Sequence, residues 1–207
     1  MNNVHEITKH FEKRLCDYTG APYAVALDNC SNALFLALKY YGIEDEFVAI
    51  PRHTYPAVPC EIIHAGGYVA WKDSNEYLTG CYRIEPTTVY DSALHFSANM
   101  YLPGSFMCLS FTGPYKHLKL GKGGAILTDD ERAYKWFKRA RFSGRNECSY
   151  LEDSFDMLGW NFYMMPEIAA KGLLLIEQFF DGNGKAIQNE PKTHRYPDLS
   201  KWPIYQK

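Results

Sequence analysis

The sequence lacks the patterns that mark several large classes of protein. No two of its six cysteines form a C-x-x-C pair, and its seven histidines include no H-E-x-x-H or similar pairing, so we expect no metal site. The longest apolar run, at 172–176, is too short to cross a bilayer, and we expect no membrane contact. A secretory leader is not recognisable. With scattered cysteines, this favours the reduced cytoplasm.

Charge of one sign is also scarce. The net charge is −2, and acids and bases are interspersed, so the chain has no basic field of the kind that nucleic-acid binding requires. A local exception is KWFKRARFSGR at 135–145. We favour a solvated helix face whose Lys and Arg stems pack down. A patch that binds an anionic small molecule is the alternative.

What the chain does contain is enough apolar sequence for one core. Its 207 residues suit a single domain, and 46% of them are hydrophobic. Aromatic residues make up 15%, and an aromatic surplus of this size indicates a surface that contacts a partner.

Short apolar segments alternate with amphipathic ones along the chain. We expect strands at 23–27, 47–51, 68–71, 87–91 and 105–111 and one starting at 124, with helices at 5–18, 28–42, 55–67, 131–141 and 165–180. This order predicts an α/β fold of three α/β/α layers around a mostly parallel sheet. The polar residues from 181 onward predict an extended tail on the chain's own or a neighbouring surface.

In such sheets, ligands bind outside the carboxyl ends of the strands. Residues 28–31 and 53–55, Asp91 and the loop after Phe111 all follow predicted strands. We therefore expect these four segments to converge on one crevice.

The loop that follows Phe111 contains Lys116, next to His117 and before the glycines of GKGG. A phosphate-binding P-loop would lead into a helix, whereas this loop leads into a strand, so that interpretation is excluded. Lys116 is either an ordinary exposed loop lysine or one whose pKa is lowered near the strand ends. A lysine of the second kind can form an imine.

Four further groups give this lysine a context. Asp91 either caps a turn or keeps a pyridine nitrogen protonated. Ser31 and Asn32 begin a helix, as a simple N-cap or as a phosphate site, and the Ser110 hydroxyl ends a strand. Tyr55 either packs in the core or lies on a cofactor ring. Taken together, these groups predict a pyridoxal-phosphate (PLP) pocket.

At these residues the chain resembles the DegT/StrS-type nucleotide-sugar aminotransferases, PLP-dependent enzymes of the aspartate-aminotransferase fold (fold type I). The resemblance is ordered along about residues 10–180. It is carried by YAVALDNCSNALFLAL, FVAIPRHTYPAV, VYDSA, SFTGPYKHLKLGKGGAILTDD, RARFSGR and LGWNFYMMPEIAAKGLLLIEQ.

The resemblance implies a role for each matching residue. Lys116 matches the Schiff-base lysine, Asp91 the partner of the pyridine nitrogen and Tyr55 the ring-stacking aromatic. Ser31, Asn32 and Ser110 match phosphate contacts, and Asn161 matches an asparagine that reaches the phosphate of the other subunit. The implied protein is a homodimer with shared active sites. Its implied substrates are a nucleotide-linked keto sugar and an amino donor such as glutamate.

The chain also departs from the family pattern. It has about half the length expected of a two-domain enzyme, so we expect a reduced large domain at 1–180 and a tail at 181–207 in place of the small domain. Cys30 replaces a glycine, Leu94 a polar residue, Tyr163 an arginine and Lys122 a glutamate. One extra residue separates Ser110 from Lys116.

These departures leave two main hypotheses. The first is a PLP-dependent sugar aminotransferase that works through Lys116. The second is a non-enzymatic descendant that binds PLP, a nucleotide-sugar or a protein partner. A weaker third is another PLP reaction on a sugar, such as dehydration; the presence of Lys116 argues against it, because related dehydratases replace that lysine with histidine.

Overall fold

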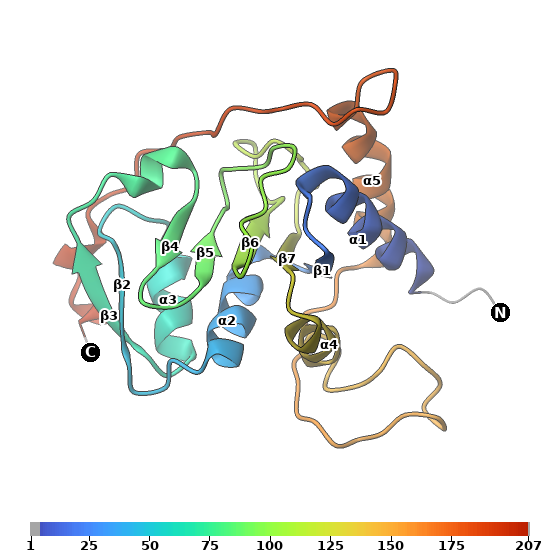
Figure 1. Cartoon of the computed structure of the whole chain (residues 1–207). Coiled ribbons are helices and arrows are strands. Elements are labelled where there is room, and N and C mark those ends of the chain that lie inside the picture. The colour runs from blue at the N-terminus through green and yellow to red at the C-terminus, as the bar shows by residue number, and fades with distance from the viewer. Residues whose placement is uncertain (1–4, 207) are drawn as a thin grey trace.

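The computed structural model describes residues 5–206, in which helices cover both faces of a central sheet (Figure 1). The helices are α1 Glu6–Thr19, α2 Cys30–Tyr41, α3 Ala57–His64, α4 Glu131–Ala140 and α5 Pro166–Ile176, and the 3-10 helices are η1 Glu76–Thr79, η2 Glu177–Phe179, η3 Leu199–Lys201 and η4 Pro203–Tyr205. The strands are β1 Tyr23–Leu27, β2 Phe47–Pro51, β3 Tyr68–Lys72, β4 Tyr82–Ile84, β5 Val89–Asp91, β6 Phe106–Ser110 and β7 Gly124–Thr128. Within 5–206, no helix is long and apolar enough to cross a bilayer.

Local sequence explains where the main helices begin and end. The Asn29 side chain accepts a hydrogen bond from the backbone N of Asn32 and so caps α2, and Asp130 caps α4 in the same way. α1 and α2 both end at a glycine in the left-handed conformation, Gly20 and Gly42, a common helix stop. Pro166 begins α5, one residue after the predicted start at 165.

The central sheet is mixed. Its five strands follow the order β1-β7-β6-β5-β4, and only β5 and β6 pair in parallel; β2 and β3 form a separate parallel pair. Ala49 and Glu85 join the two sheets by a bridge with N···O distances of 2.7 and 3.1 Å. The α/β fold with its layers is confirmed, but the expectation of a mostly parallel sheet was wrong. An apolar strand indicates only that both of its faces are buried. An antiparallel strand between two helix layers is buried on both faces as well, so the pattern does not distinguish the two directions.

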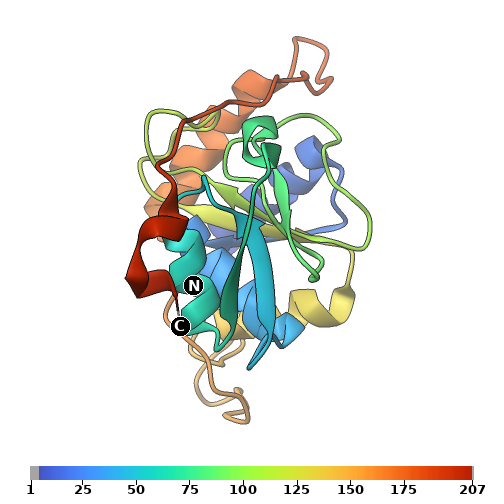
Figure 2. The ribbon, with the colours of Figure 1, turned by 90° about the vertical axis from the view of Figure 1, so that its left-hand side faces the viewer.

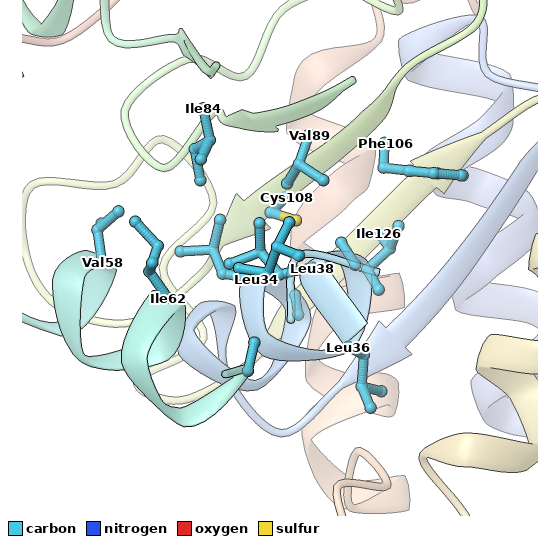
Figure 3. Close-up of a cluster of buried hydrophobic side chains, with 14 of the residues drawn as sticks. Leu34, Leu36, Leu38, Val58, Ile62, Ile84, Val89, Phe106, Cys108 and Ile126 are labelled. Atoms are coloured by element: carbon cyan, nitrogen blue, oxygen red, sulfur yellow. The ribbon is translucent and has the colours of Figure 1, made fainter. Parts of the chain in front are cut away.

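Two apolar cores lie on opposite faces of the sheet. α2, α3 and α4 cover one face, where residues such as Val25, Leu34 and Ile126 gather. α1 and α5 cover the other, with Ala24 and Phe11 among the buried residues. Figure 3 shows the first core packed between α2, α3 and the strands, with Leu34, Leu38, Val58, Ile62, Ile84, Val89, Phe106 and Cys108 among its labelled members.

The cations at 135–145 belong to ion pairs. Arg141 is fully buried and pairs with Glu12 of α1 and with Glu147, and Lys138 bridges the same two carboxylates at 3.1 and 2.7 Å. The solvated face that we favoured was therefore wrong for Arg141. This network ties α1 to α4. Because carboxylates of the same chain pair with these cations, the positive charge that an anion-binding patch would need is already neutralised.

The tail runs over the chain's own surface. After α5 it crosses to the far side of the molecule and ends beside α3 (Figures 1 and 2). Its course is fixed by hydrogen bonds, among them Tyr18 Oη to Ile187 O at 2.8 Å and the backbone N of Leu199 to Arg52 O at 2.9 Å.

Candidate functional site

A cavity of about 470 Å³ opens at the edge of the sheet where β1, β5 and β6 end. This volume lies within the range of about 300–1,000 Å³ that is usual for small-molecule sites. The residues that follow β1, β2, β5 and β6 all contribute to its walls, so the predicted convergence on one crevice is confirmed.

Five of the seven predicted site residues line this cavity: Ser31, Tyr55, Asp91, Ser110 and Lys116. Asn32 and Asn161 do not. The Asn32 side chain donates to Asp28 Oδ1 at 2.7 Å, which turns it away from the cavity. Asn161 is exposed in the segment between α4 and α5.

Asp91 ends β5 and is only 5% exposed. Tyr82 Oη donates to its Oδ2 at 3.0 Å, and the backbone N of Ala93 donates to its Oδ1 at 3.0 Å. Burial raises the pKa of Asp91, although Ala93, Lys116 and Tyr82 act in the opposite direction. Asp91 is therefore an acidic side chain at the cavity wall that two hydrogen bonds hold in place, one of them from Tyr82.

Lys116 lies in the loop between β6 and β7, and its amine is within electrostatic reach of Asp91. Burial lowers the pKa of Lys116, while Cys30 and Asp91 raise it. A lowered pKa increases the fraction of neutral amine, which is the nucleophilic form. Lys116 is therefore a partly buried lysine on the cavity wall and not an ordinary exposed loop lysine.

The glycines after Lys116 set the lysine loop against α2. A Cβ on Gly124 would lie 2.5 Å from both Asn29 C and Cys30 N, so only glycine permits this contact. Gly123 has a φ of +130°, which an L side chain rarely adopts, and forms a bridge with Asn29. Strand β7 then follows, which agrees with the exclusion of a P-loop.

The N-terminus of α2 forms the polar end of the cavity. Asn29 caps only the N–H of Asn32, and the N–H groups of Cys30 and Ser31 precede the first intrahelical bonds. Ser31 and Ser110, which each carry a hydroxyl, line the same cavity. Helix N–H groups together with hydroxyls are a donor set that suits a phosphate.

The residues that depart from the family pattern fall in different places. Cys30 and Leu94 line the cavity. Tyr163 lies elsewhere, with the Cζ of Arg141 over its ring at 4.7 Å from the ring centre. Lys122 is exposed, and its Nζ lies 3.9 Å from an Asp28 carboxylate oxygen. Burial is the main cause that raises the pKa of the Cys30 thiol, followed by Asp91, so this thiol is neutral.

Several lining residues were missed by sequence reasoning. Tyr82 was missed because β4 has only three residues, too few for a clear alternation. Its hydroxyl also hydrogen-bonds Thr54. His194 and Tyr196 come from the tail, which was expected to be extended but was not expected to reach the cavity. The available signal was that His194 and Tyr196 stand at alternate positions of PKTHRYPD, which suits an extended segment with both side chains on one face.

Comparison with known proteins connects this geometry to a family. SpsC, the spore coat polysaccharide biosynthesis protein of Bacillus subtilis, is 40% identical over 70 residues, which are 33% of this chain and 18% of SpsC. Spr1654 of Streptococcus pneumoniae, assigned as a sugar aminotransferase, matches in its PLP-form with a TM-score of 0.66 and 21% identity over 83% of this chain and 59% of that one. It is also known in a PMP-form.

A third relative is a mutant of GDP-4-keto-6-deoxymannose-3-dehydratase (ColD) with bound GDP-perosamine. It matches with a TM-score of 0.65 and 17% identity, over 84% of this chain and 61% of that one. The chain therefore spans about 60% of the length of these two solved structures and a smaller part of SpsC.

The family model gives the widest match in sequence, over residues 3–87 and 102–181. The first segment contains Ser31 and Tyr55, and the second contains Lys116 and α5. On this match, the chain belongs to the DegT/DnrJ/EryC1/StrS aminotransferase family.

Proposed function

We propose that this chain binds PLP in the cavity and acts as an aminotransferase on a keto sugar, one linked to a nucleotide. The observation that carries the proposal is that Lys116 and Asp91 face the same cavity as the N-terminus of α2. When bound, PLP supplies an aldehyde that an amine can attack and a ring that withdraws electrons.

The residues present fit this group. Lys116 Nζ is the amine that would attach it covalently, and once released it would carry a proton as general acid and base. Asp91 would hold the ring nitrogen in its protonated form, with Tyr82 fixing the carboxylate. Ser31, Ser110 and the N–H groups of Cys30 and Ser31 would bind the phosphate. We assign no phosphate contact to Asn32, because its backbone N–H donates to Asn29 Oδ1 and its side chain donates to Asp28 Oδ1.

The relatives support the cofactor and the substrate class. Spr1654 is known in PLP- and PMP-forms, and ColD holds GDP-perosamine. For this chain we propose a nucleotide-linked keto sugar as amino acceptor and glutamate as a donor. We treat residues 1–180 as the cofactor-binding core and 181–207 as its tail. The six free cysteines favour a reducing compartment, and we propose the cytoplasm.

We also propose a homodimer that shares its sites. The segment between α4 and α5 projects from the body (Figure 1) and exposes large apolar side chains, among them Leu151, Phe155 and Leu158. Exposed apolar clusters of this kind mark interaction sites. Asn161 lies in the same segment, so in the proposed dimer it would contact the site of the second chain.

The decisive experiment is a titration of the purified protein with PLP. An absorbance band should appear, borohydride should trap it, and the pyridoxyl mass should lie on the peptide that carries Lys116. Lys116→Ala should abolish the band. Lys119→Ala is the matched control, because Lys119 is an exposed lysine in the same loop. A band that survives in Lys116→Ala, or no band in the folded wild type, would reject the proposal.

The alternative is a chain that binds without turnover. It is favoured by Leu94, an apolar side chain on the cavity wall where the family has a polar one. The same titration followed by addition of glutamate separates the two. An aminotransferase converts the cofactor to its amine form and shifts the band, whereas a binding protein leaves it unchanged.

A further inference from the structure

Residues 192–198, here called the strap, run past the mouth of the cavity. Their side chains alternate: Lys192, His194, Tyr196 and Asp198 are partly buried, and Thr193, Arg195 and Pro197 are exposed. A period of two is the pattern of an extended strand with one face against the protein. The strap therefore presents a defined inner face.

Both ends of the strap are anchored to loops of the site. At one end, the backbone N of Lys192 donates to Leu94 O at 2.9 Å, and its Nζ donates to the backbone O of Lys116 at 3.1 Å. At the other end, Asp198 lies 3.7 Å from Arg52, which precedes the loop of Tyr55. The strap thus connects the loop of Lys116 to the loop of Tyr55.

The middle of the strap lines the cavity. The ring of His194 lies 5.1 Å from that of Tyr115 and 4.7 Å from that of Tyr196, between ring centres. The Tyr196 ring lies 6.1 Å from that of Tyr55, and the Tyr196 carbonyl accepts a hydrogen bond from His53 Nδ1 at 3.0 Å. A cavity of about 470 Å³ remains with both side chains in place, so the strap is a wall and not a plug.

Tyr196 lines the cavity and is within electrostatic reach of Asp91. Burial, Asp91, Tyr55 and Cys30 together raise the pKa of Tyr196 to about 12, so it stays protonated at neutral pH. A neutral phenol and an imidazole offer hydrogen-bond donors to a polar ligand.

We propose that the strap completes the cofactor site from within the chain, with His194 and Tyr196 as ligand contacts. A ligand that fills the cavity then holds the strap closed, because it adds contacts that the detached strap lacks. This inference rests on the proposed function for the identity of the ligand, a phosphorylated pyridine aldehyde attached at Lys116.

The test compares PLP affinity in paired variants of the strap. His194→Ala with Tyr196→Ala should raise the Kd for PLP about tenfold, the equivalent of one good contact. Thr193→Ala with Arg195→Ala, on the outer face, should change it less than about twofold. His194→Gln and Tyr196→Phe serve if the first pair fails to fold, since they keep the packing. Equal Kd values for folded inner and outer variants would overturn the inference.

A second readout is independent of these substitutions. Arg195 is exposed, so trypsin should cleave after it when the strap detaches, and PLP should slow this cleavage in the wild type about fivefold or more. Lys116→Ala should lose the protection. If PLP binds the wild type but leaves the cleavage rate unchanged, the strap inference fails alone. If PLP does not bind the wild type, the proposed function and the strap inference both fail.

Discussion

At the scale of single residues, the site depends on a buried hydrogen bond. Tyr82 Oη donates to Asp91 and also contacts Thr54, and all three residues are buried. Tyr82→Phe keeps the ring but removes these bonds, so we expect the free energy of unfolding at pH 7 to fall by about 1–3 kcal/mol. Urea denaturation measures it. Tyr150→Phe, at an exposed tyrosine, should change it by less than about 0.5 kcal/mol.

Tyr82→Phe should also raise the pKa of Asp91, because the Tyr82 hydrogen bond lowers that pKa. In the PLP-loaded protein, the cofactor band should become more sensitive to pH. If Tyr82→Phe is as stable as the wild type in urea denaturation, the Tyr82–Asp91 hydrogen bond makes no net contribution to the free energy of unfolding.

Gly124 gives a second prediction at this scale. Gly124→Ala would place a Cβ 2.5 Å from the backbone of Asn29 and Cys30, which must shift to accept it. We expect a loss of about 1–3 kcal/mol in stability, as for overpacking, with weaker PLP binding. Gly182→Ala is the matched control because its Cβ would meet open space, and it should cost less than about 0.5 kcal/mol. Equal effects in thermal unfolding would contradict the close contact.

At the scale of elements, buried ions join α1 to α4. Burial would raise the pKa of Glu147, but Arg141 and Lys138 outweigh it and hold the pKa below its ordinary value of 4.5. A carboxyl with a lower pKa in the folded than in the unfolded state stabilises the fold above its unfolded pKa. This contribution is therefore present above about pH 4.5 and is lost as the pH falls through the folded pKa.

Glu147→Gln should cost about 1–3 kcal/mol at pH 7, because Arg141 and Lys138 lose one charged partner but keep Glu12. It should also make the loss of stability between pH 5 and pH 3 shallower than in the wild type. Glu131→Gln, in an exposed pair with Lys135, should change neither quantity much. Urea unfolding across this pH range decides, and parallel curves would rule out Glu147 as a source of the acid sensitivity.

At the scale of the whole molecule, the segment between α4 and α5 predicts the oligomeric state. Leu151 is 97% exposed and Leu158 is 93% exposed, values that suit an interface better than a free surface. We expect the wild type to sediment as a dimer and Leu151→Glu with Leu158→Glu as a monomer. Ile204→Glu, at an apolar residue of η4 that is 71% exposed, should leave the dimer intact.

Shared sites make a further prediction. If Asn161 serves the partner's phosphate, Asn161→Ala and Lys116→Ala should each bind PLP poorly, yet mixing the two should restore up to one intact site in each mixed dimer. Absorbance of the mixture measures it. No recovery after subunit exchange would place Asn161 outside the site.

The sequence by itself determined most of the elements and which residues are candidates for the site. Helix caps such as Asn29 and Asp130, together with apolar strands such as 23–27, are local signals, and the helices and most strands were found within a few residues of their predicted bounds. Lys116, Asp91 and Ser31 were recognisable because each lies at or after the end of a strand, and the ends of neighbouring strands meet at one edge of a sheet.

Only the tertiary structure decided the direction of the strands, the hydrogen bond of Tyr82 to Asp91 and the course of the tail. β7 is antiparallel to β6 because the lysine loop returns without a crossover helix, and an apolar pattern carries no direction. Tyr82 reaches Asp91 from a strand too short to recognise, and His194 and Tyr196 reach the cavity from about 80 residues beyond Lys116. Contacts over such separations depend on how the layers pack, which the local sequence does not encode.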